Sequence, residues 1–433
     1  MSRWELEPAT GLHGRIEVPG DKSISHRALM LAAVASGTSH LHGLPHGEDV
    51  RSTAACLRSL GIEVDVAPAD GAMRVCGAGL DGLRQTADAL PCGNSGTTMR
   101  LLAGLLAGRS FRTTLDGDRS LRSRPMERIA EPLRAMGAMV SMRDGGLPPL
   151  SIEGGRLRGV TYRTPVPSAQ VKSCVLLAGL CADGDTVVHE ERPSRDHTER
   201  MLASMGAEIV GEAAHGGVRL RPQPRLEPLQ GRVPGDLSSA AYWVAAASVA
   251  ERADLELLGV GVNPTRSAVL DVLLDWGAMI ELQPEPEWHG EPCALIRARH
   301  GNGLRGGVIG GESVAALIDE LPLLALLGPL TDEGVEIRGA AELRVKESDR
   351  IAAVCAALRA LGARVDEFPD GLAVAGQQGL TGGTVDACGD HRIALATAAV
   401  AGAASGPIEV VGADAAAVSY PGFREQLRSA SVR

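Results

Sequence analysis

Six copies of one short element are spread along the chain, and their repetition limits the folds that it can adopt. Each copy is a turn of Gly or Pro and small polar residues, followed by an Ala/Leu-rich stretch that is typical of a helix. The turns lie at 19–22, 91–97, 167–170, 234–239, 310–313 and 388–392, about seventy residues apart. Such self-similarity indicates a protein built from similar modules.

Five repeats continue with a second amphipathic stretch, a Gly and a β-like stretch. The Gly residues that follow these second stretches are Gly61, Gly137, Gly206, Gly277 and Gly362. Gly directly after a helix is typical of a left-handed cap. Alternating segments such as 15–18 predict strands between the helices. The chain is therefore predicted to have an α/β (α+β) fold.

The number of repeats also predicts the domain organisation. A chain of 433 residues with 44% hydrophobic content can fill two or three domains. No repeat can bury its own faces, so six repeats suggest two pseudo-symmetric lobes of three. Segment 216–235, rich in Pro, Arg and Gly, is the candidate hinge. A single large α/β sheet is the alternative.

Composition excludes several classes of function. A net charge of −10 and 2% aromatic residues argue against a nucleic-acid binder, which needs a basic surface and stacking platforms. The N-terminus lacks the apolar core of a signal peptide, and no apolar run reaches the roughly 18 residues of a membrane span. The sequence predicts a cytoplasmic protein that meets any anionic ligand in a local basic cleft.

Cysteine and histidine give no metal signature. The eight cysteines form no C-x-x-C pair, and most lie in apolar stretches, as Cys56, Cys174, Cys181 and Cys355 do. Buried free thiols are therefore favoured over disulfides or a metal site. Cys92 and Cys388 precede two of the turns, where packed thiols are favoured over thiols that face a cleft. The cluster of His40, His42 and His46 lacks a Cys and is typical of a strand leading into a loop, so no metal is predicted.

Lysine is rare and occurs in similar surroundings each time. Arginine supplies all of the 43 basic residues except Lys22, Lys172 and Lys346, which lie in Ser-containing, helix-like stretches. A compact ammonium group can approach a substrate or lose a proton where a broad, permanently charged guanidinium cannot. Chance survival under an arginine-rich bias is the alternative, but three such positions favour a function.

The predicted helix starts are typical of anion-binding sites. Ser, Asn, Thr, Gly or Asp begin these helices, and free N–H groups at helix starts attract phosphate or carboxylate. The cations in or near the turns are Lys22, Arg27, Arg124, Arg195, Lys346, Arg350 and Arg392. Segment 118–125 concentrates positive charge before a helix, where an anion is needed to offset it. Ordinary capping with solvated arginines is the alternative.

Two acids among these cations are candidates for proton transfer. Asp319 is expected in the middle of an apolar helix, where an unpaired carboxylate is costly to bury. It is then either ion-paired or a working base. Glu347 beside Lys346 and Arg350 is either a weak surface pair or a second proton-transfer group.

Taken together, these motifs resemble those of the enolpyruvyl transferases, most closely the branch that acts on shikimate 3-phosphate. The matching segments are 19–27, 93–100, 122–126, 168–173, 319–322, 344–350 and 390–392. The resemblance implies a two-lobed inside-out α/β barrel with three βαβαββ-type repeats in each lobe. The lobes would be 21–232 and 1–20 plus 233–433, and they would close over the substrates.

The resemblance also implies the reaction. Phosphoenolpyruvate would join the 5-hydroxyl of shikimate 3-phosphate by addition and elimination, with release of phosphate. Lys22, Asp319 and Glu347 would be catalytic. The residues that would hold shikimate 3-phosphate are Lys22, Ser23, Arg27, Ser168, Ala169, Gln170, Arg195, Asp319 and Lys346. Those that would hold phosphoenolpyruvate are Lys22, Asn94, Gly96, Arg124, Gln170, Lys346, Glu347, Arg350 and Arg392.

The resemblance implies no metal or organic cofactor. The protein would be a monomer whose partners are these two small molecules, with no nucleic acid and no membrane. Gly96 lacks a methyl group that would crowd the phosphoenolpyruvate pocket, which implies sensitivity to glyphosate.

Departures from the family pattern are Val418, where some relatives have Lys, Ala169 in place of a second Ser, and Leu101 in place of Pro.

Two rival functions remain. The branch that acts on UDP-N-acetylglucosamine shares the fold, but it typically carries a reactive Cys that segment 111–125 lacks. A non-catalytic repeat protein that binds polyanions would keep the arginines but would have no use for Asp319 and Glu347. Phosphate release from the two substrates separates all three functions.

Overall fold

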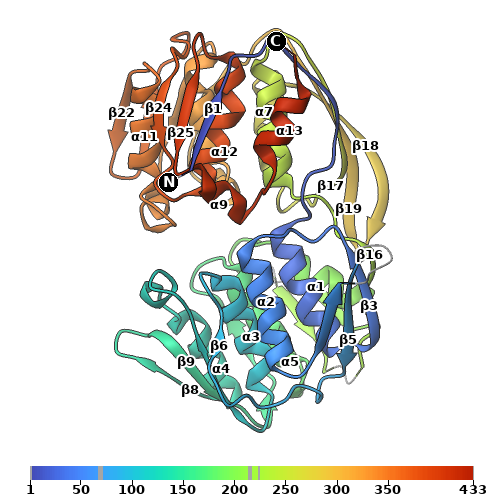
Figure 1. Ribbon diagram of the computed structural model, residues 1–433. Helices are drawn as coiled ribbons and strands as arrows, with labels where there is room; N and C mark the ends of the chain where they lie inside the picture. The colour runs from blue at the N-terminus through green and yellow to red at the C-terminus, as the bar shows by residue number, and fades with distance from the viewer. Residues whose placement is uncertain (1, 67–71, 213–216, 223–224, 433) are drawn as a thin grey trace. The chain divides into compact units, whose positions relative to one another are not determined.

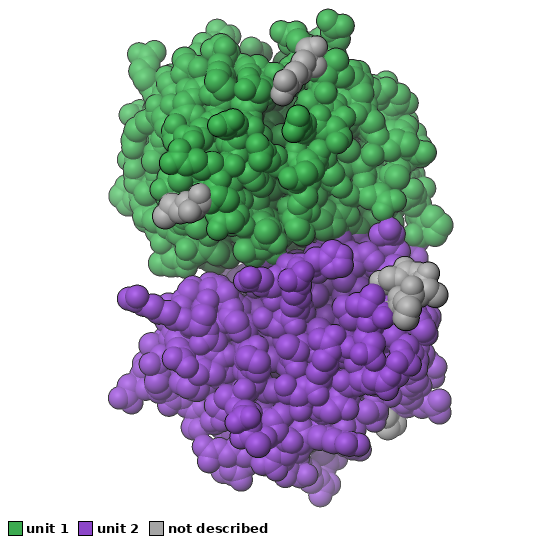
Figure 2. All heavy atoms as spheres, in the orientation of Figure 1, with its two compact units in different colours: residues 1–19, 235–286, 292–433 green, residues 20–234, 287–291 purple. Residues whose placement is uncertain are grey.

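The fold is described from a computed structural model that covers residues 2–66, 72–212, 217–222 and 225–432. The chain forms two units (Figures 1 and 2). Unit 1 comprises 1–19, 235–286 and 292–433, and unit 2 comprises 20–234 and 287–291. The predicted α/β class, with mixed sheets and helices, is confirmed.

Unit 2 contains three four-stranded sheets with one pairing pattern. In each sheet an outer strand pairs in parallel with its neighbour, and the remaining pairs are antiparallel. In spatial order they are β16 (Gln230–Arg232), β3 (Ser36–His42), β5 (Met73–Ala78) and β4 (Glu63–Val66); β6 (Leu90–Pro91), β7 (Arg112–Asp116), β9 (Leu147–Glu153) and β8 (Met139–Arg143); and β11 (Thr161–Arg163), β13 (Thr186–His189), β15 (Gly217–Leu220) and β14 (Ile209–Glu212). A parallel pair, β10 (Leu157–Arg158) and β12 (Ala182–Asp183), completes the strands described in this unit.

The helices of unit 2 lie between its sheets (Figure 1). They are α1 (Lys22–Val34), α2 (Glu48–Ser59), α3 (Gly96–Ala107), α4 (Glu127–Met136), α5 (Ala169–Gly179) and α6 (His197–Ser204), with a 3₁₀ turn η1 (Leu121–Ser123). Helices α1, α3 and α5 are buried over most of their lengths, as expected for helices that are apolar on all sides. Gly104 permits close packing of α3 on α5, because a Cβ there would lie 2.2 Å from the carbonyl oxygen of Cys174.

Unit 1 repeats the same four-stranded pattern once and adds two further sheets. The repeated sheet is β20 (Gly307–Ile309), β21 (Val335–Ile337), β23 (Gly371–Val374) and β22 (Val365–Phe368). The others are β1 (Arg3–Leu6), β25 (Ile408–Val411) and β24 (Gly383–Asp386); and β18 (Met279–Trp288), β19 (Glu291–Arg299), β17 (Ala253–Gly261), β2 (Gly11–Ile16) and β26 (Ser431–Val432). The first two strands of the chain therefore pair with strands near its C-terminal end.

The helices of unit 1 contribute to an apolar core that includes Tyr242, Trp243, Tyr420 and Phe423. They are α7 (Leu237–Val249), α8 (Ala268–Asp275), α9 (Ser313–Leu317), α10 (Leu321–Leu327), α11 (Arg350–Ala360), α12 (His391–Val400) and α13 (Phe423–Ala430), with 3₁₀ turns η2 (Gly328–Leu330), η3 (Ala341–Val345), η4 (Ala401–Ala403) and η5 (Ala413–Val418). Phe423 lies with its ring centroid 5.1 Å from that of Trp243 and 5.0 Å from that of Tyr420. The Trp243 indole donates a hydrogen bond to the Tyr420 hydroxyl at 3.0 Å, which satisfies a buried polar pair.

Most of the predicted local elements are present. A helix begins at or just after each of the six turns, and Gly61, Gly137, Gly206, Gly277 and Gly362 all have positive φ. The fifth repeat differs, because residues 318–320 form a turn between α9 and α10. Pro322 lies at the start of α10, where its ring and missing N–H suit a first helical turn but not a helix interior. The expectation that Asp319 lies in mid-helix is therefore wrong.

The candidate hinge is mostly part of unit 2. Residues 216 and 223–224 of this segment lie outside the described residues. Strands β15 and β16 lie in the rest, and within this segment the chain passes from unit 2 to unit 1 between Pro234 and Gly235. The described part of the segment thus contains two strands of unit 2, and its crossing lies at its end.

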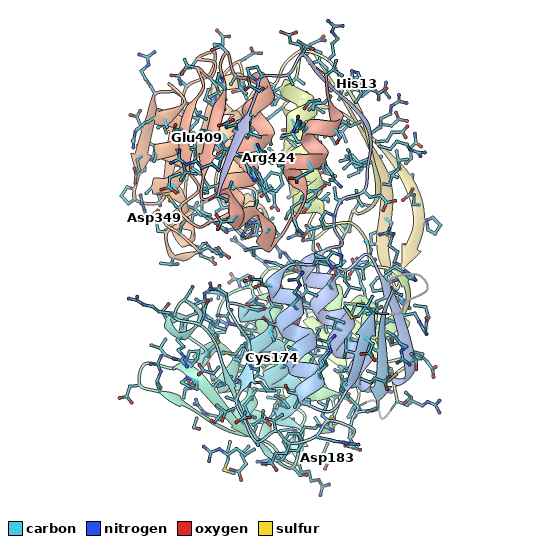
Figure 3. All side chains as sticks on the ribbon, in the orientation of Figure 1. His13, Cys174, Asp183, Asp349, Glu409 and Arg424 are labelled. Atoms are coloured by element: carbon cyan, nitrogen blue, oxygen red, sulfur yellow. The ribbon has the colours of Figure 1, made fainter. Side chains whose placement is uncertain are left out.

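The cysteines are all free thiols. Cys56, Cys92, Cys174 and Cys355 are buried as expected, and burial raises the pKa of the Cys174 thiol in α5 (Figure 3). Cys181 is half-buried, whereas Cys388 is exposed, so the packed position expected for Cys388 is wrong. It lies in the turn before α12 with a φ of 52°.

None of the helices in the described ranges has the length and apolar character that a membrane span requires.

Candidate active site

Three helix starts in unit 2 carry the predicted anion-binding motifs. Asp21, Ser95 and Ser168 cap α1, α3 and α5, and each side chain accepts a hydrogen bond from an N–H of the first turn. The caps satisfy one N–H each and leave the others in the first turn without an intrahelical acceptor. These helix starts therefore favour negative charge, as the sequence predicted.

Lys22, at the start of α1, is paired with an acid that sequence reasoning missed. Its Nζ donates to Asp49 Oδ2 at 3.2 Å, at the beginning of α2. Burial opposes ionisation of Asp49, but the neighbouring Lys22 ammonium outweighs it and lowers the pKa of Asp49. Asp49 thus holds the Lys22 ammonium in place. Burial also lowers the pKa of His26 to about 3, so His26 is neutral near pH 7.

Asn94, Gly96 and Arg124 lie together at the start of α3. Arg124 Nη2 donates to Asn94 Oδ1 at 2.6 Å and to Ser120 Oγ at 3.1 Å. A Cβ on Gly96 would lie 3.7 Å from Arg124 Nη1 and 2.7 Å from Arg100 Nη1. The absence of a side chain at Gly96 therefore makes room for the Arg100 guanidinium.

Gln170 joins the start of α5 to this group. Arg100 Nη1 donates to Gln170 Oε1 at 2.8 Å, and Gln170 Nε2 donates to Thr97 Oγ1 at 3.0 Å. Burial, followed by the charges of Arg124 and Arg128, lowers the pKa of Arg100 to about 10. Arg100 was not among the predicted site residues, although it ends the quoted 93–100 motif.

Arg27 anchors a second group of predicted residues. It is 3% exposed and donates to Thr198 Oγ1 at 2.8 Å, to Ser173 Oγ at 2.8 Å and to the Ser23 carbonyl at 2.9 Å. Burial lowers its pKa to about 10, which Glu199 opposes and Arg195 reinforces. Arg195 is therefore close enough to Arg27 for the two positive charges to interact.

In unit 1 the predicted residues form a separate cluster around Asp319. Its carboxylate oxygens lie 3.4 Å from Arg392 Nη2, 3.8 Å from Arg266 Nη1 and 3.9 Å from Arg350 Nη1. Arg392 Nη1 also donates to the Asp319 carbonyl at 2.7 Å. Burial opposes the charge on Arg392, but Asp319, Tyr242, Glu320 and Asp236 outweigh it and raise its pKa. Three guanidinium groups thus converge on one carboxylate.

Arg350 connects Asp319 to Glu347. It is 1% exposed, and it donates to Glu347 Oε2 at 2.6 Å and to Asp390 Oδ2 at 2.8 Å. Burial opposes ionisation of Asp390, but Arg350 outweighs it and lowers the pKa of Asp390. Lys346, by contrast, extends to Glu342 Oε1 at 2.5 Å, and the structure shows no hydrogen bond or ion pair from it to Asp319.

Several residues of this cluster were missed from the sequence. Arg266 Nη2 donates to Ser238 Oγ at 2.8 Å, and Ser238 donates in turn to Glu320. Arg266 ends an Asn-Pro-Thr-Arg turn after β17, and the Asn-Pro pair was the signal that could have marked it.

The predicted residues thus divide between the two units. Those in unit 2 are Lys22, Ser23, Arg27, Asn94, Gly96, Arg124, Ser168, Ala169, Gln170 and Arg195, and those in unit 1 are Asp319, Lys346, Glu347, Arg350 and Arg392. Among the described side chains, no group of three His, Cys, Asp or Glu is arranged to hold a metal ion.

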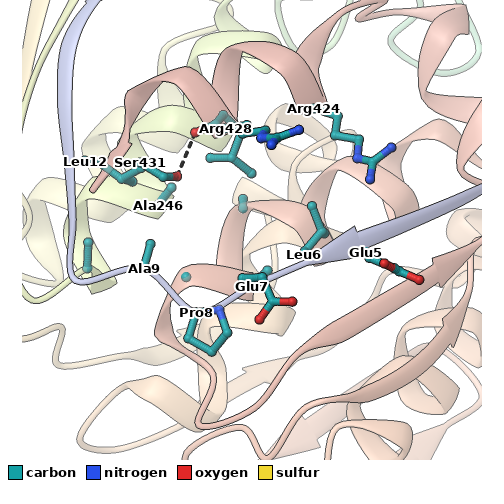
Figure 4. Close-up of a pocket in the computed structure, with 15 residues that line it drawn as sticks. Glu5, Leu6, Glu7, Pro8, Ala9, Leu12, Ala246, Arg424, Arg428 and Ser431 are labelled. Atoms are coloured by element: carbon teal, nitrogen blue, oxygen red, sulfur yellow. Dashed lines mark hydrogen bonds between the residues drawn. The ribbon is translucent and has the colours of Figure 1, made fainter. Parts of the chain in front are cut away.

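A cavity of about 240 Å³ in unit 1 lies apart from the Asp319 cluster (Figure 4). It is lined by Leu6, Ala246, Leu427 and neighbouring residues of β1, α7 and α13, and it shares no lining residue with that cluster.

Comparison with known proteins decides the family. The family model for EPSP synthase (3-phosphoshikimate 1-carboxyvinyltransferase) matches residues 6–427. The chain belongs to the EPSP synthase family. It is 50% identical to the 3-phosphoshikimate 1-carboxyvinyltransferase of Synechococcus sp. (strain JA-3-3Ab), over 98% of this chain and 95% of that protein. It is also 50% identical to that of Pelotomaculum thermopropionicum, over 98% and 97%.

Solved structures agree with this assignment. EPSP synthase from Acinetobacter baumannii matches with a TM-score of 0.89 and 40% identity, over 99% of this chain and 98% of that one. The enolpyruvyl transferase NikO from Streptomyces tendae matches with a TM-score of 0.79 at 20% identity, over 98% and 96%, and so supports the fold alone. The predicted family and its enzymatic activity are thereby confirmed.

Proposed function

We propose that this EPSP synthase family member transfers the enolpyruvyl group of phosphoenolpyruvate to the 5-hydroxyl of shikimate 3-phosphate. The products are 5-enolpyruvylshikimate 3-phosphate and inorganic phosphate, within the shikimate pathway of aromatic amino acid biosynthesis. Family membership supports this assignment most directly. The convergence of three guanidinium groups on Asp319 fits a site for anionic substrates that also needs one fixed carboxylate.

Each proposed set of binding residues draws on both units. Shikimate 3-phosphate is held by Lys22, Ser23, Arg27, Ser168, Ala169, Gln170, Arg195, Asp319 and Lys346. Phosphoenolpyruvate is held by Lys22, Asn94, Gly96, Arg124, Gln170, Lys346, Glu347, Arg350 and Arg392. The guanidinium groups of Arg27 and Arg350, which are buried, and of Arg392, which is 11% exposed, support binding of anions, because planar forks bind phosphate and carboxylate bidentately.

In the addition step, Asp319 accepts the proton of the 5-hydroxyl as its oxygen bonds to C2 of phosphoenolpyruvate. Glu347 gives a proton to C3, and a tetrahedral ketal phosphate results. In the elimination step, Glu347 takes a proton back from the new methyl group. The C2–O bond to phosphate breaks, the departing phosphate takes the proton that Asp319 had accepted, and Lys22 assists at the departing oxygen. Positioning and fixed charge supply the remaining stabilisation, and the reaction requires no metal or organic cofactor.

The proposed architecture is a two-lobed inside-out α/β barrel with lobes 21–232 and 1–20 plus 233–433, each built of three βαβαββ-type repeats. The four sheets with a shared pairing pattern support the repeats, and the division into two units supports the lobes. We propose a monomer whose small-molecule partners are the two substrates.

Phosphate release by the purified protein tests the activity. We expect release only when phosphoenolpyruvate and shikimate 3-phosphate are both present. Release with UDP-N-acetylglucosamine as the acceptor instead would assign the chain to the other branch of enolpyruvyl transferases. Binding of both anions without release would identify a non-catalytic binder.

Replacing Gly96 by Ala should weaken phosphoenolpyruvate binding and reduce inhibition by glyphosate. The added Cβ would lie 2.7 Å from Arg100 Nη1, so the guanidinium must shift. Crowding of this kind costs about 1–3 kcal/mol, and 1.4 kcal/mol is a factor of ten, so KM for phosphoenolpyruvate should rise about tenfold or more. Initial rates at varied phosphoenolpyruvate and glyphosate concentrations measure both effects.

Gly155→Ala is the matched control, because a Cβ there meets nothing within 4 Å. Its kinetic constants should equal those of the natural enzyme. Unchanged phosphoenolpyruvate and glyphosate constants in Gly96→Ala would remove Gly96 from the proposed site.

A further inference from the structure

Lys172 lies in a buried polar cluster that the proposed reaction does not use. It is 4% exposed in α5, and its Nζ lies 2.8 Å from Glu190 Oε2 and 2.8 Å from Glu199 Oε1. It also donates to the Ser194 carbonyl at 3.2 Å. The three donors of the ammonium therefore have three acceptors. Burial opposes the charge, but the two glutamates outweigh it and raise the pKa of Lys172, so the side chain is charged at neutral pH.

Glu190 extends this cluster to two backbone segments. Its Oε1 accepts from the Ser168 N–H at 3.1 Å, and its Oε2 accepts from the Ser194 N–H at 3.0 Å. Ser168 is the N-cap of α5, and Ser194 directly precedes Arg195. Glu190 and Lys172 thus hold both the N–H and the carbonyl of Ser194, and they fix the start of α5 to the loop that carries Arg195.

The neighbouring residues tie this cluster to Arg27. Ser173 follows Lys172 on α5, and Thr198 precedes Glu199 on α6. The Ser173 hydroxyl accepts from Arg27 at 2.8 Å and from the Thr198 hydroxyl at 2.7 Å. Lys172 thus binds the backbone of Ser194, while its neighbour Ser173 and Thr198 on α6 hold the Arg27 guanidinium.

We propose that Lys172 and Glu190 are positioning residues. They place Ser168 and Arg195 beside Arg27 for binding of shikimate 3-phosphate. The inference rests on the proposed function, which assigns Ser168, Arg195 and Arg27 to this substrate. It also explains why lysine is kept at this position in an arginine-rich chain. A planar guanidinium is larger than the ammonium and cannot place three donors at these acceptors in a closely packed interior.

The structure supplies a matched pair of variants. Glu190 and Glu199 both lie 2.8 Å from Lys172 Nζ, but of the two only Glu190 accepts from Ser168 and Ser194 among the bonds described. Glu190→Gln replaces one acceptor oxygen by an amide NH₂ that faces an N–H or the ammonium. Loss of charged hydrogen bonds should raise the dissociation constant for shikimate 3-phosphate about tenfold or more. Glu199→Gln should raise it less than about threefold.

Lys172→Met and Lys172→Arg test the ammonium itself. Both should raise the dissociation constant and KM for shikimate 3-phosphate about tenfold or more, with KM for phosphoenolpyruvate within about threefold of the natural enzyme. Arg109→Met is the stability control. Arg109 is another buried cation of unit 2, hydrogen-bonded to the Leu80 carbonyl and Asp81, and its loss should lower the melting temperature without changing substrate constants.

Calorimetry with shikimate 3-phosphate alone and initial rates with both substrates separate the outcomes. A natural enzyme that releases no phosphate would overturn the proposed function. An active natural enzyme whose Glu190→Gln and Glu199→Gln variants bind shikimate 3-phosphate equally well would overturn the positioning role alone. The positioning role would also be overturned if the Lys172 variants raised KM for both substrates equally. It would likewise be overturned if Lys172→Arg bound shikimate 3-phosphate as well as the natural enzyme does. If the Lys172 variants are insoluble, the two glutamine variants decide the question.

Discussion

Asp319→Ala should lose turnover while it still binds both substrates. The carboxylate lies in the turn between α9 and α10 with three guanidinium groups within 3.9 Å, and alanine can accept no proton from a hydroxyl. General-base catalysis contributes about 10²–10⁴-fold, so kcat should fall by about that factor. The arginines remain and would keep their attraction for the anionic substrates. Single-turnover rates together with calorimetric dissociation constants measure the two effects separately.

Asp319→Asn refines this experiment, because the amide keeps the size of the side chain. It should lose turnover as severely as Asp319→Ala, since an amide is no base. Asp366→Asn, on the exposed face of β22, is the control and should turn over normally. A near-normal kcat in either Asp319 variant would exclude this residue as the proton acceptor.

Arg350→Met should destabilise the protein and also impair phosphoenolpyruvate binding. The guanidinium is 1% exposed, and Asp390, its partner at 2.8 Å, is 0% exposed. Removing one member of a buried ion pair costs about 3–5 kcal/mol, because the other charge is left uncompensated. Denaturant unfolding at pH 7 measures this loss, and KM for phosphoenolpyruvate measures the loss of a ligand contact.

The destabilisation should depend on pH. In the natural enzyme the pKa of Asp390 is lowered below 3.8, so its contribution to stability is present above that pH and is lost as the pH falls through the folded pKa. Without the guanidinium, burial raises the pKa of Asp390, and the variant regains stability as Asp390 is protonated on acidification. The difference between the two proteins should therefore shrink from pH 7 toward about pH 4.

Arg297→Met provides the comparison, because its pair with Asp254 at 2.7 Å is solvent-exposed. Exposed pairs contribute little, so its unfolding curve should nearly match that of the natural enzyme at both pH values. An equal loss of stability in Arg350→Met and Arg297→Met, or no pH dependence, would contradict the account of the buried pair.

The features that sequence reasoning predicted well are those decided by neighbouring residues. Ser95 and Ser168 mark helix starts because the capping hydroxyl bonds an N–H only three positions away. Asp349 likewise caps α11 (Figure 3). Gly137 ends α4 because it adopts a left-handed backbone without steric cost. Such signals do not depend on the remainder of the fold.

The features that were missed depend on distant residues. Arg266 reaches Asp319 across 53 positions, and Glu190 reaches Ser168 across 22. Nothing in the neighbouring sequence distinguishes Glu190 from an ordinary surface charge, and only the Asn-Pro pair of its turn marks Arg266. Asp319 was placed in mid-helix because its surroundings are apolar, whereas Pro322 and the three arginines favour a turn there. The residues of the candidate site could therefore be predicted from their motifs, but the ion pairs that support them could not be predicted.

The division of the chain has a consequence for how the protein is made. Unit 2 is almost one continuous stretch, 20–234, whereas β1 and β2 of unit 1 pair with β25, β17 and β26, far along the chain. During synthesis from the N-terminus, unit 2 can acquire its core while the first nineteen residues still lack their partners. β2 can pair once β17 has been made, but the ribosome must deliver nearly the whole polypeptide before β1 finds β25, so late truncations should leave one half folded and the other exposed to proteases.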